Sequence, residues 1–531
     1  MMRKNIYKWH RVSSLIIAIP VLLWAFSGFM HPIMTNFRPA VSTQAIPVEA
    51  LNKHKIPLSL QEVLARNKLD SVYSVRLIHI DTNWFYQLRL NAGVQLTYIS
   101  AKNGQILPKG DWLYAQYLAR FFLEGPLSKD VSHRQDTLVR PVAPSMAMDC
   151  CGEAAATVLH HKRGAPIAGV SAVHTFNNEY KSIYCLLPVY KVAFDRVDRI
   201  RLYVETGQDR FAVAFDKNRA AFNAFFSLVH TWGWINFLGK GRVLVEMFFC
   251  GLAFLTALMG IYIFCTTRSK KVQGNKLVKA RRNHRYTAIV ASIFTLMFCF
   301  SGGYHAFSGL KGEEKTVYRS NHAFAASAVT FDLDQLQDVV QKPISNIGLV
   351  QIDGQSYWQV YVAANQESAK TKDLMAEMGT DAAEVVYVRM HDYAILPNGD
   401  EKYAQELATA FSGKNQQAIV SCAPITRFTD EYNFTDKRLP VWKVSYSDNH
   451  RERLYIETST GVLAKRTNDL EVYEGYSFAL LHKHHYMDFF GKTVRDISTM
   501  VGAGLQVLMI AVGLILYVRW RNRRASSVGK R

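Results

Sequence analysis

The chain of 531 residues lacks the short motifs that mark most nucleotide-dependent and hydrolytic enzymes. It has no Walker loop, no Rossmann glycine fingerprint after a strand, no serine nucleophile elbow and no zinc-protease helix motif. We therefore expect no nicotinamide or flavin to be bound within this chain.

Charged residues are also scarce, at 20% of the chain, whereas 49% of the residues are hydrophobic. This composition excludes a disordered chain, a coiled coil and a collagen-like protein. A mean hydropathy of −0.04 excludes a protein that lies wholly within a membrane. The length predicts at least two structural units.

Four long apolar runs occur, at residues 12–30, 243–264, 288–304 and 500–518. Each is long enough to cross a hydrocarbon layer of about 30 Å. The first run begins like a signal peptide, but it is too long and lacks a small-residue cleavage site. We therefore interpret it as a retained helix, and the sequence predicts four transmembrane helices.

Acidic residues are absent from three basic segments, 1–11, 266–285 and 519–531, which carry four, eight and six Lys or Arg residues. These segments hold most of the net charge of +20. By the positive-inside rule they are cytoplasmic, and the nearly neutral connections 31–242 and 305–498 lie outside. Because the charge follows this topology, we do not expect nucleic acid as a partner.

The two halves of the chain repeat each other. Residues 187–206 and 439–458 share 11 identities in 20 positions. His10 and His284 each lie 17 residues before a Ser-Gly pair. Both copies run in the same direction, so we expect a parallel repeat of one unit: a helix in, a large outside domain and a helix out.

The expected fold is an α+β membrane protein with four transmembrane helices from an internal parallel duplication and two large periplasmic α+β domains. Local patterns predict a short helix over 59–68 and strands over 74–79, 84–90, 190–194 and 199–205. The expected boundaries are a first transmembrane helix with a cytoplasmic N-terminus (1–34), an outside domain (35–242), a second helix (243–265), a basic cytoplasmic loop (266–286), a third helix (287–306), a second outside domain (307–497), a fourth helix (498–518) and a basic cytoplasmic tail (519–531).

The repeated unit resembles the PepSY-associated transmembrane family. The likeness is carried by the Trp-His-Arg start of the first helix, its Ser-Gly end, modules that end in Thr-Gly or Asn-Gly, and a Leu-x-His approach to the next helix. Within that family the chain is similar to iron–siderophore reductases of the bacterial inner membrane. The resemblance implies PepSY-like domains, haem b bound between the helices, and a periplasmic ferric siderophore or ferric chelate as electron acceptor.

Histidines occupy the same three positions in both halves. His10 and His31 are 21 residues apart, about 31 Å along a helix, and face broadly the same side. The first and third helices are parallel, so we expect His10 to meet His284 at the cytoplasmic face and His31 to meet His305 at the outer face. Two facing imidazoles suit a bis-histidine haem, whereas zinc requires further ligands.

The outer ligand set stays open at this point. The candidates on that side, with His484 and His485 nearby, are His31, His305, His230 and His482. They suit either one haem with two spare histidines or two haems as crossed pairs. From the resemblance we expect two haems, with His10 and His284 as the cytoplasmic pair and an outer pair drawn from the other four.

A second function also stays open. PepSY modules elsewhere are associated with inhibiting or chaperoning proteases, so the alternative is a periplasmic interaction or regulatory protein without redox activity. Cofactor content distinguishes the two. In the redox hypothesis the electrons come from a cytoplasmic donor or from quinol. Two copies of the unit already supply four helices, which suits a functional monomer embedded in lipid.

The seven cysteines divide by location. Those in or at the spans, expected to act as small apolar residues, are Cys250, Cys265 and Cys299. The four outside, whose disulfide pairing the sequence leaves open, are Cys150, Cys151, Cys185 and Cys422. The loop around Cys150-Cys151 also carries Glu153, His160 and His161. A metal site there is the minor alternative to a disulfide or an irregular loop.

Overall fold

The computed structural model describes residues 2–125, 164–268, 276–310, 318–363 and 384–528. The chain forms two compact units. The helical unit comprises Met1–Arg38, Asn218–Lys315 and Leu470–Arg531, and the strand unit comprises Pro39–Lys217 and Thr316–Asp469.

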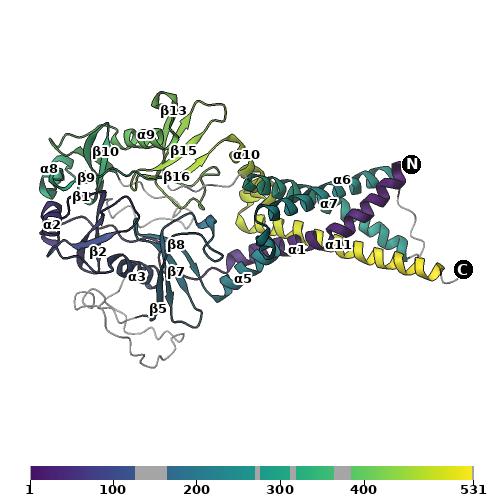
Figure 1. Ribbon diagram of the computed structural model, residues 1–531. Coiled ribbons are helices and arrows are strands. Elements are labelled where there is room, and N and C mark those ends of the chain that lie inside the picture. Colours follow the sequence, from purple (N-terminus) through teal and green to yellow (C-terminus); the bar gives the residue numbers. More distant parts are fainter. Residues whose placement is uncertain (1, 126–163, 269–275, 311–317, 364–383, 529–531) are drawn as a thin grey trace. The chain divides into compact units, whose positions relative to one another are not determined.

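Four long helices form the body of the helical unit (Figure 1). They are α1 (Met2–Asn36), α6 (Lys240–Thr266), α7 (Lys276–Leu310) and α11 (Lys492–Val528). Each is long and apolar enough to cross a membrane, as the sequence predicts. Each also extends beyond its apolar run, because the polar and basic residues that flank the run continue the helix instead of ending it.

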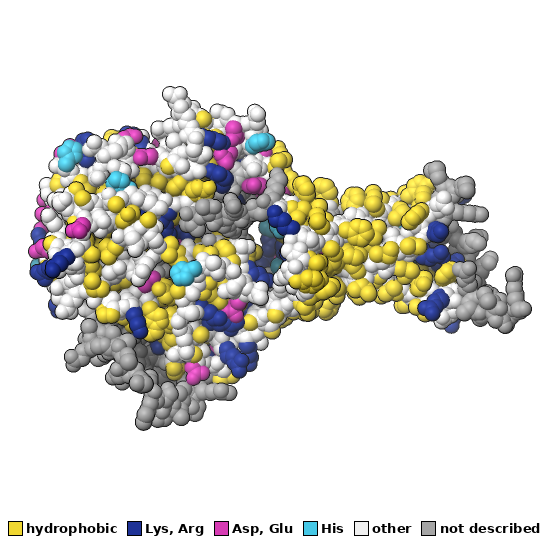
Figure 2. Space-filling view, in the orientation of Figure 1, with side chains coloured by type: hydrophobic (Ala, Val, Ile, Leu, Met, Phe, Trp, Pro, Cys, Tyr) yellow, Lys and Arg dark blue, Asp and Glu magenta, His cyan; other side chains and the backbone are white. Residues whose placement is uncertain are grey.

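The four helices pack as a bundle. Helices α1 and α7 each contact α6 and α11, which places the first and third helices on one diagonal. Figure 2 shows hydrophobic side chains along the visible face of the bundle, with Lys and Arg near the end that holds both termini. On the long helices Ile19 is 70% exposed and Phe248 61% exposed. Such exposure of large apolar side chains is expected where the solvent is lipid.

Short helices at the other end of the bundle lead into α6 and α11. Those before α6 are α5 (Lys217–Val229) and η3 (Gly233–Leu238). Those before α11 are α10 (Asp469–Ser477), η8 (Phe478–His482) and η9 (His485–Phe490). The two halves thus approach their second long helix through similar short segments.

The strand unit contains the same series of antiparallel sheets from each half of the chain. The first half gives β2 (Ser74–Ile80), β3 (Asn83–Arg89) and β4 (Thr97–Ser100), followed by β5 (Ile167–Val173), β6 (Val189–Phe194), β7 (Arg201–Glu205) and β8 (Arg210–Phe215). The second half gives β10 (Ile344–Ile352), β11 (Gln355–Val362) and β12 (Val385–Arg389), followed by β13 (Ile419–Ile425), β14 (Val441–Tyr446), β15 (Arg453–Glu457) and β16 (Val462–Thr467). In each sheet the strands pair in chain order.

The helices of the strand unit pack against these sheets. They are α2 (Leu60–Arg66), α3 (Gly110–Glu124), α8 (Leu333–Val340) and α9 (Gly399–Ser412). The predicted helix over 59–68 is α2, which begins at a capping box of Ser59 and Glu62. The four predicted strands are β2, β3, β6 and β7.

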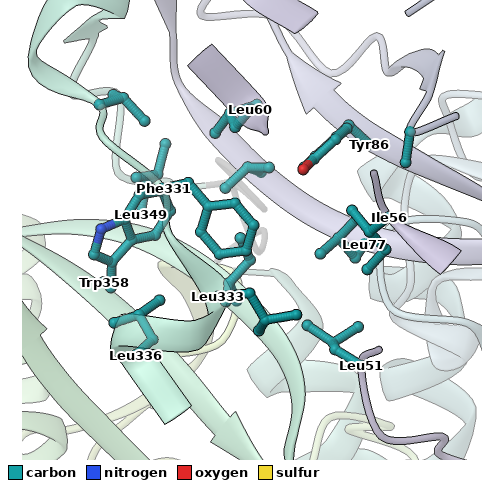
Figure 3. Close-up of a cluster of buried hydrophobic side chains, with 14 of the residues drawn as sticks. Leu51, Ile56, Leu60, Leu77, Tyr86, Phe331, Leu333, Leu336, Leu349 and Trp358 are labelled. Atoms are coloured by element: carbon teal, nitrogen blue, oxygen red, sulfur yellow. The ribbon is translucent and has the colours of Figure 1, made fainter. Parts of the chain in front are cut away.

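One hydrophobic core is built from both halves of the chain (Figure 3). Leu60 and Tyr86 of the first half pack in the same cluster as Leu336 and Trp358 of the second half, all fully buried. A short pair of strands, β1 (Ser71–Val72) and β9 (Phe324–Ala325), also joins the halves. The two outside domains expected over 35–242 and 307–497 are therefore one compact unit, because the module of each half completes its core with the module of the other.

An asparagine links the adjoining edges of β2 and β10. The Asn346 side chain accepts a hydrogen bond from the Leu77 backbone N–H and donates one to the Leu77 carbonyl, both at 2.9 Å. The pairing register of β10 shifts between Ile344 and Asn346. A side-chain amide thus takes the place of a strand-to-strand ladder and satisfies backbone groups at this edge.

Four buried charges form a second link between the halves. Arg438 donates to Glu457 at 2.6 Å and to Glu205 at 3.2 Å, and Arg210 bonds the same two carboxylates. Burial alone would raise the pKa of Glu457, but the two guanidinium groups outweigh it and lower that pKa to about 2. The quartet is charge-balanced, and removing one member leaves its partners buried without compensation.

Candidate functional site

Two histidines from equivalent positions of the halves face each other in the helical unit. The ring centroids of His230, which follows α5, and His482, the last residue of η8, lie 6.2 Å apart with planes at 86°. Phe226 stacks on His230 at 4.4 Å, and Phe478 stacks on His482 at 4.6 Å. Each imidazole is carried by a short segment that leads into a long helix.

A serine of a long helix holds each of these rings. Ser27 Oγ lies 2.9 Å from His230 Nδ1, and Ser301 Oγ lies 3.2 Å from His482 Nδ1. Both hydroxyls donate their proton to the carbonyl four residues earlier, at 2.7 and 2.8 Å. The serine oxygens therefore accept from Nδ1–H. We infer the tautomer in which Nε2 keeps its lone pair, which is the form that binds a metal.

The centroid separation of His230 and His482 is close to that of two imidazoles whose Nε2 atoms both bind one metal ion. A metal–imidazole bond is about 2.0 Å long, and a five-membered ring with bonds of about 1.35 Å has a centre-to-corner distance of about 1.15 Å. The distance from the metal to each ring centroid is the sum of these two lengths, so two imidazoles on opposite sides of one metal have centroids about 6.3 Å apart. The distance in this structure is 6.2 Å. Two axial nitrogens on one iron are the ligand set of a bis-histidine haem.

A second histidine pair lies nearer the end of the bundle that holds the termini. His10 Nδ1 donates to the Thr256 carbonyl at 3.2 Å, which again leaves Nε2 with its lone pair. His284 interacts electrostatically with His10, and its Nδ1 is buried without a hydrogen-bond partner among the described residues. A Cβ added to Gly260 would lie 3.3 Å from His10 Cε1, and one on Gly513 would lie 3.5 Å from His284 Cε1. Each ring therefore rests against bare backbone.

The expected contact between His31 and His305 is not formed, because the two side chains have different partners. The Lys483 Nζ lies 3.4 Å from both ring nitrogens of His31. His305 Nδ1 lies 2.6 Å from a carboxylate oxygen of Glu474, and its side chain is 61% exposed. Neither histidine faces a second imidazole as His230 and His482 do.

His484 is a buried histidine whose role the sequence did not indicate. Its Nδ1 lies 2.9 Å from Ser498 Oγ, and its Nε2 is buried with no partner in the described part of the chain. The ring stacks on Phe298 at 5.5 Å with planes at 6°. In the first half the same place holds Trp232, which stacks on Trp24 at 4.9 Å with planes also at 6°. The stacked pair of the first half, Trp24 with Trp232, thus corresponds to Phe298 with His484 in the second half.

Within the described residues no group of three or more His, Cys, Asp or Glu side chains could hold a metal ion. His230 with His482 and His10 with His284 occur as pairs, which suits a haem better than a structural zinc site. The loop candidate with Cys150, Cys151, Glu153, His160 and His161 lies outside the described residues. Cys422 in β13 has a free thiol.

The strand unit has a separate cavity of about 460 Å³. Its lining includes Tyr318, Arg319, His322, Tyr403 and Glu406. The Nε of Arg319 is buried and lacks a hydrogen-bond partner among the residues that the structure describes.

Sequence reasoning named six repeat-related histidines as candidate ligands but gave no role to the serines that orient two of them. The signal was present, because Ser27 and Ser301 occupy the Ser-Gly pair that repeats 17 residues after His10 and His284. Comparison of the sequence with models of known families and with curated proteins gives no match. The site is therefore interpreted from its own geometry.

Proposed function

We propose that this chain is a haem-containing electron-transfer protein of the bacterial inner membrane, related to the PepSY-associated transmembrane family. Its function would be to pass electrons from a cytoplasmic donor or quinol to periplasmic ferric iron bound to a siderophore or other chelator. The observation that carries the proposal is the His230–His482 pair, with its 6.2 Å centroid separation and serine-held Nδ1 atoms.

The proposed ligands form two levels in the helical unit. His10 and His284 would hold one haem b, and His230 and His482 a second. On α1 and α7 the inner histidine and the serine that holds the outer one are 17 residues apart, about 25 Å along the axis. Both levels therefore fit within one membrane thickness. Bound haem would supply one-electron chemistry, while the serines hold the His230 and His482 imidazoles, and the Thr256 carbonyl the His10 imidazole, in the ligating tautomer.

The proposed topology follows from charge. The three segments without acidic residues belong to one side by the positive-inside rule, so we place both termini in the cytoplasm and the strand unit in the periplasm. The parallel element order of the halves supports an origin by internal duplication. Such a chain already carries four spans, which suits a functional monomer.

The proposed acceptor is ferric iron in a chelate of hard oxygen ligands. Each Fe(III) that gains one electron becomes Fe(II), a softer and less charged ion that such a chelator holds more weakly. The haem would carry the redox chemistry, and the protein would tune it through the axial imidazoles and their burial. Identity of the chelator rests on the family resemblance.

An absorption spectrum of the purified full-length chain tests the proposal. We expect a sharp reduced α-band of the b type with about two haems per chain, counted as the pyridine complex. The His10→Ala and His284→Ala variants should each lose one haem. A colourless protein, made with ample haem supplied, would overturn the proposal and would favour a regulatory PepSY protein without redox activity.

A further inference from the structure

The Lys483 ammonium is a cation in an unusual place. It follows His482 directly in the chain and interacts electrostatically with His31, His230 and His482. Its closest polar contacts are the two ring nitrogens of His31, both at 3.4 Å. Because the two distances are equal, the ammonium does not form a directed hydrogen bond to one ring nitrogen. A neutral imidazole also supplies no negative charge to balance the ammonium.

The nearby carboxylates are already paired. Asp488 accepts from Arg495 at 2.9 Å, and Asp496 accepts from Lys492 at 2.7 Å. Within the described residues no carboxylate lies at ion-pair distance from Lys483. A partly buried ammonium without a counter-ion is costly, so this position is suited to an anion that the chain itself does not provide.

The equivalent position of the first half carries no charge. Thr231 follows His230, and its hydroxyl donates to the Ser227 carbonyl at 3.2 Å. The cation beside this position in the first half is Arg242, which donates to the Thr231 carbonyl and already has a counter-ion in Glu246 at 3.6 Å. Lys483 is therefore not a requirement of the repeated fold, which forms equally well around a threonine.

We propose that Lys483 forms an ion pair with a carboxylate of the haem held between His230 and His482. This inference rests on the proposed function and deepens it by assigning a residue that recognises the ionised edge of the prosthetic group. Haem b carries two carboxylates and no other ionised substituent. A charge-assisted N–H···O bond from an ammonium is the usual way for a protein to hold such a group.

Haem release from the purified full-length protein tests this assignment. Release to an excess of apomyoglobin should be about ten- to hundredfold faster for one of the two haems in Lys483→Met, since a hydrogen bond to a charged group is lost. Lys483→Arg keeps the charge and should remain within about threefold of the unmodified chain. Lys240→Met, which removes an exposed lysine at the start of α6, should change neither haem.

A second arm identifies the carboxylate. Protein reloaded with haem dimethyl ester, in which both carboxylates are blocked, should release one haem as fast as Lys483→Met releases native haem. In the Lys483→Met variant, the ester and native haem should be released at the same rate. The reduction potential of the same haem should also fall in Lys483→Met, because a nearby positive charge that favours the reduced form is gone.

Two results would overturn the inference while leaving the proposed function intact. One is unchanged release and unchanged potential in Lys483→Met at two haems per chain. The other is a Lys483→Met effect that persists in full with the ester, together with loss of co-purified anionic lipid, which would assign Lys483 to a phosphate headgroup. A chain that binds no haem would overturn the proposed function and this inference together.

Discussion

The two units of this protein use the repeated sequence in opposite ways. In the helical unit, equivalent residues of the halves face each other as like pairs, such as His230 with His482. In the strand unit, the halves meet through unlike residues, such as Asn346 with the Leu77 backbone and Arg438 with Glu205. Like pairs suit a site that needs two identical ligands, whereas unlike pairs suit a contact that has only to be stable and specific.

This difference shows that the two halves keep identical residues where a site needs two identical ligands. An axial site for one metal is served by two imidazoles of the same tautomer, so the supporting serine recurs as well. A buried ionic link is served by opposite charges, so its members must differ. The predictions that follow test each unit without disturbing the other.

The largest expected effect is on the outer histidine pair. Under the proposed assignment, His230→Ala should remove one of the two haems, because one of its two proposed ligands is lost and the other imidazole has no partner. His305→Ala is the matched control, since this histidine contacts Glu474 and not a second imidazole. Pyridine-haem counting on purified chains measures both. If His305→Ala loses a haem while His230→Ala keeps both, the assignment of His230 and His482 as the outer ligands is wrong.

The next effect belongs to the strand unit. Glu457→Gln should lower the free energy of unfolding of this unit by about 3–5 kcal/mol, because Arg210 and Arg438 each lose one of their two carboxylate partners. The exposed pair of Glu49 and Lys55 gives the control, and Glu49→Gln should cost no more than about 1 kcal/mol. Urea unfolding followed by tryptophan fluorescence measures both, and the haem count should stay unchanged.

The stability lost in Glu457→Gln should also depend on pH. The pKa of Glu457 is lowered from 4.5 to about 2 in the folded chain, so its stabilisation is present above pH 4.5 and is lost as the pH falls through 2. The difference in stability between the unmodified chain and Glu457→Gln should therefore shrink across this window. A difference that stays constant from pH 6 to pH 2 would contradict the assignment of the charge.

A smaller effect is expected at the serine that orients the outer ligand. Ser27→Ala should weaken haem retention by about ten- to hundredfold without abolishing binding, as loss of a supporting hydrogen bond to a ligand does. Thr266→Ala removes a hydroxyl that donates only to a backbone carbonyl, so it serves as the control. Haem release measures both, and equal rates in the two variants would exclude an orienting role for Ser27.

The smallest effect concerns the seam between β2 and β10. Asn346→Ala should destabilise the strand unit by about 1–3 kcal/mol, since the Leu77 N–H and carbonyl lose their partner. Asn103→Ala, in an exposed turn, should change stability by less than about 0.5 kcal/mol. Thermal unfolding of the purified chain is the measurement. Equal midpoints for the two variants would mean that water replaces the amide at no cost.

Much of the fold was accessible from sequence because its signals are local. The four spans follow from apolar length, and α2 follows from Ser59 and Glu62 at capping-box spacing. The shared core was not accessible, because each half has the strand pattern of a complete sheet and nothing local shows which module covers it. The Asn346 seam escaped prediction for the same reason.

The candidate site divides in the same way. Repetition of the sequence identified all six repeat-related histidines, but spacing along α1 and α7 favoured a contact between His31 and His305. In the structure the facing histidines are instead His230 and His482, which lie on the short segments before α6 and α11. The sequence pattern of these short segments does not predict the direction in which their side chains point. His484 replaces Trp232 of the first half, so the repeat gave no signal for it.

The core in Figure 3 has a consequence for how the protein is made. The first half finishes its share of that core at Ala101, and the second half completes it only at Met390. At about 5–20 residues per second the ribosome needs on the order of fifteen seconds to a minute for this interval. During that time apolar surface around Leu60 and Tyr86 is uncovered while two further helices enter the membrane. Biosynthesis of this chain therefore includes an interval in which a chaperone would have a defined apolar surface to protect.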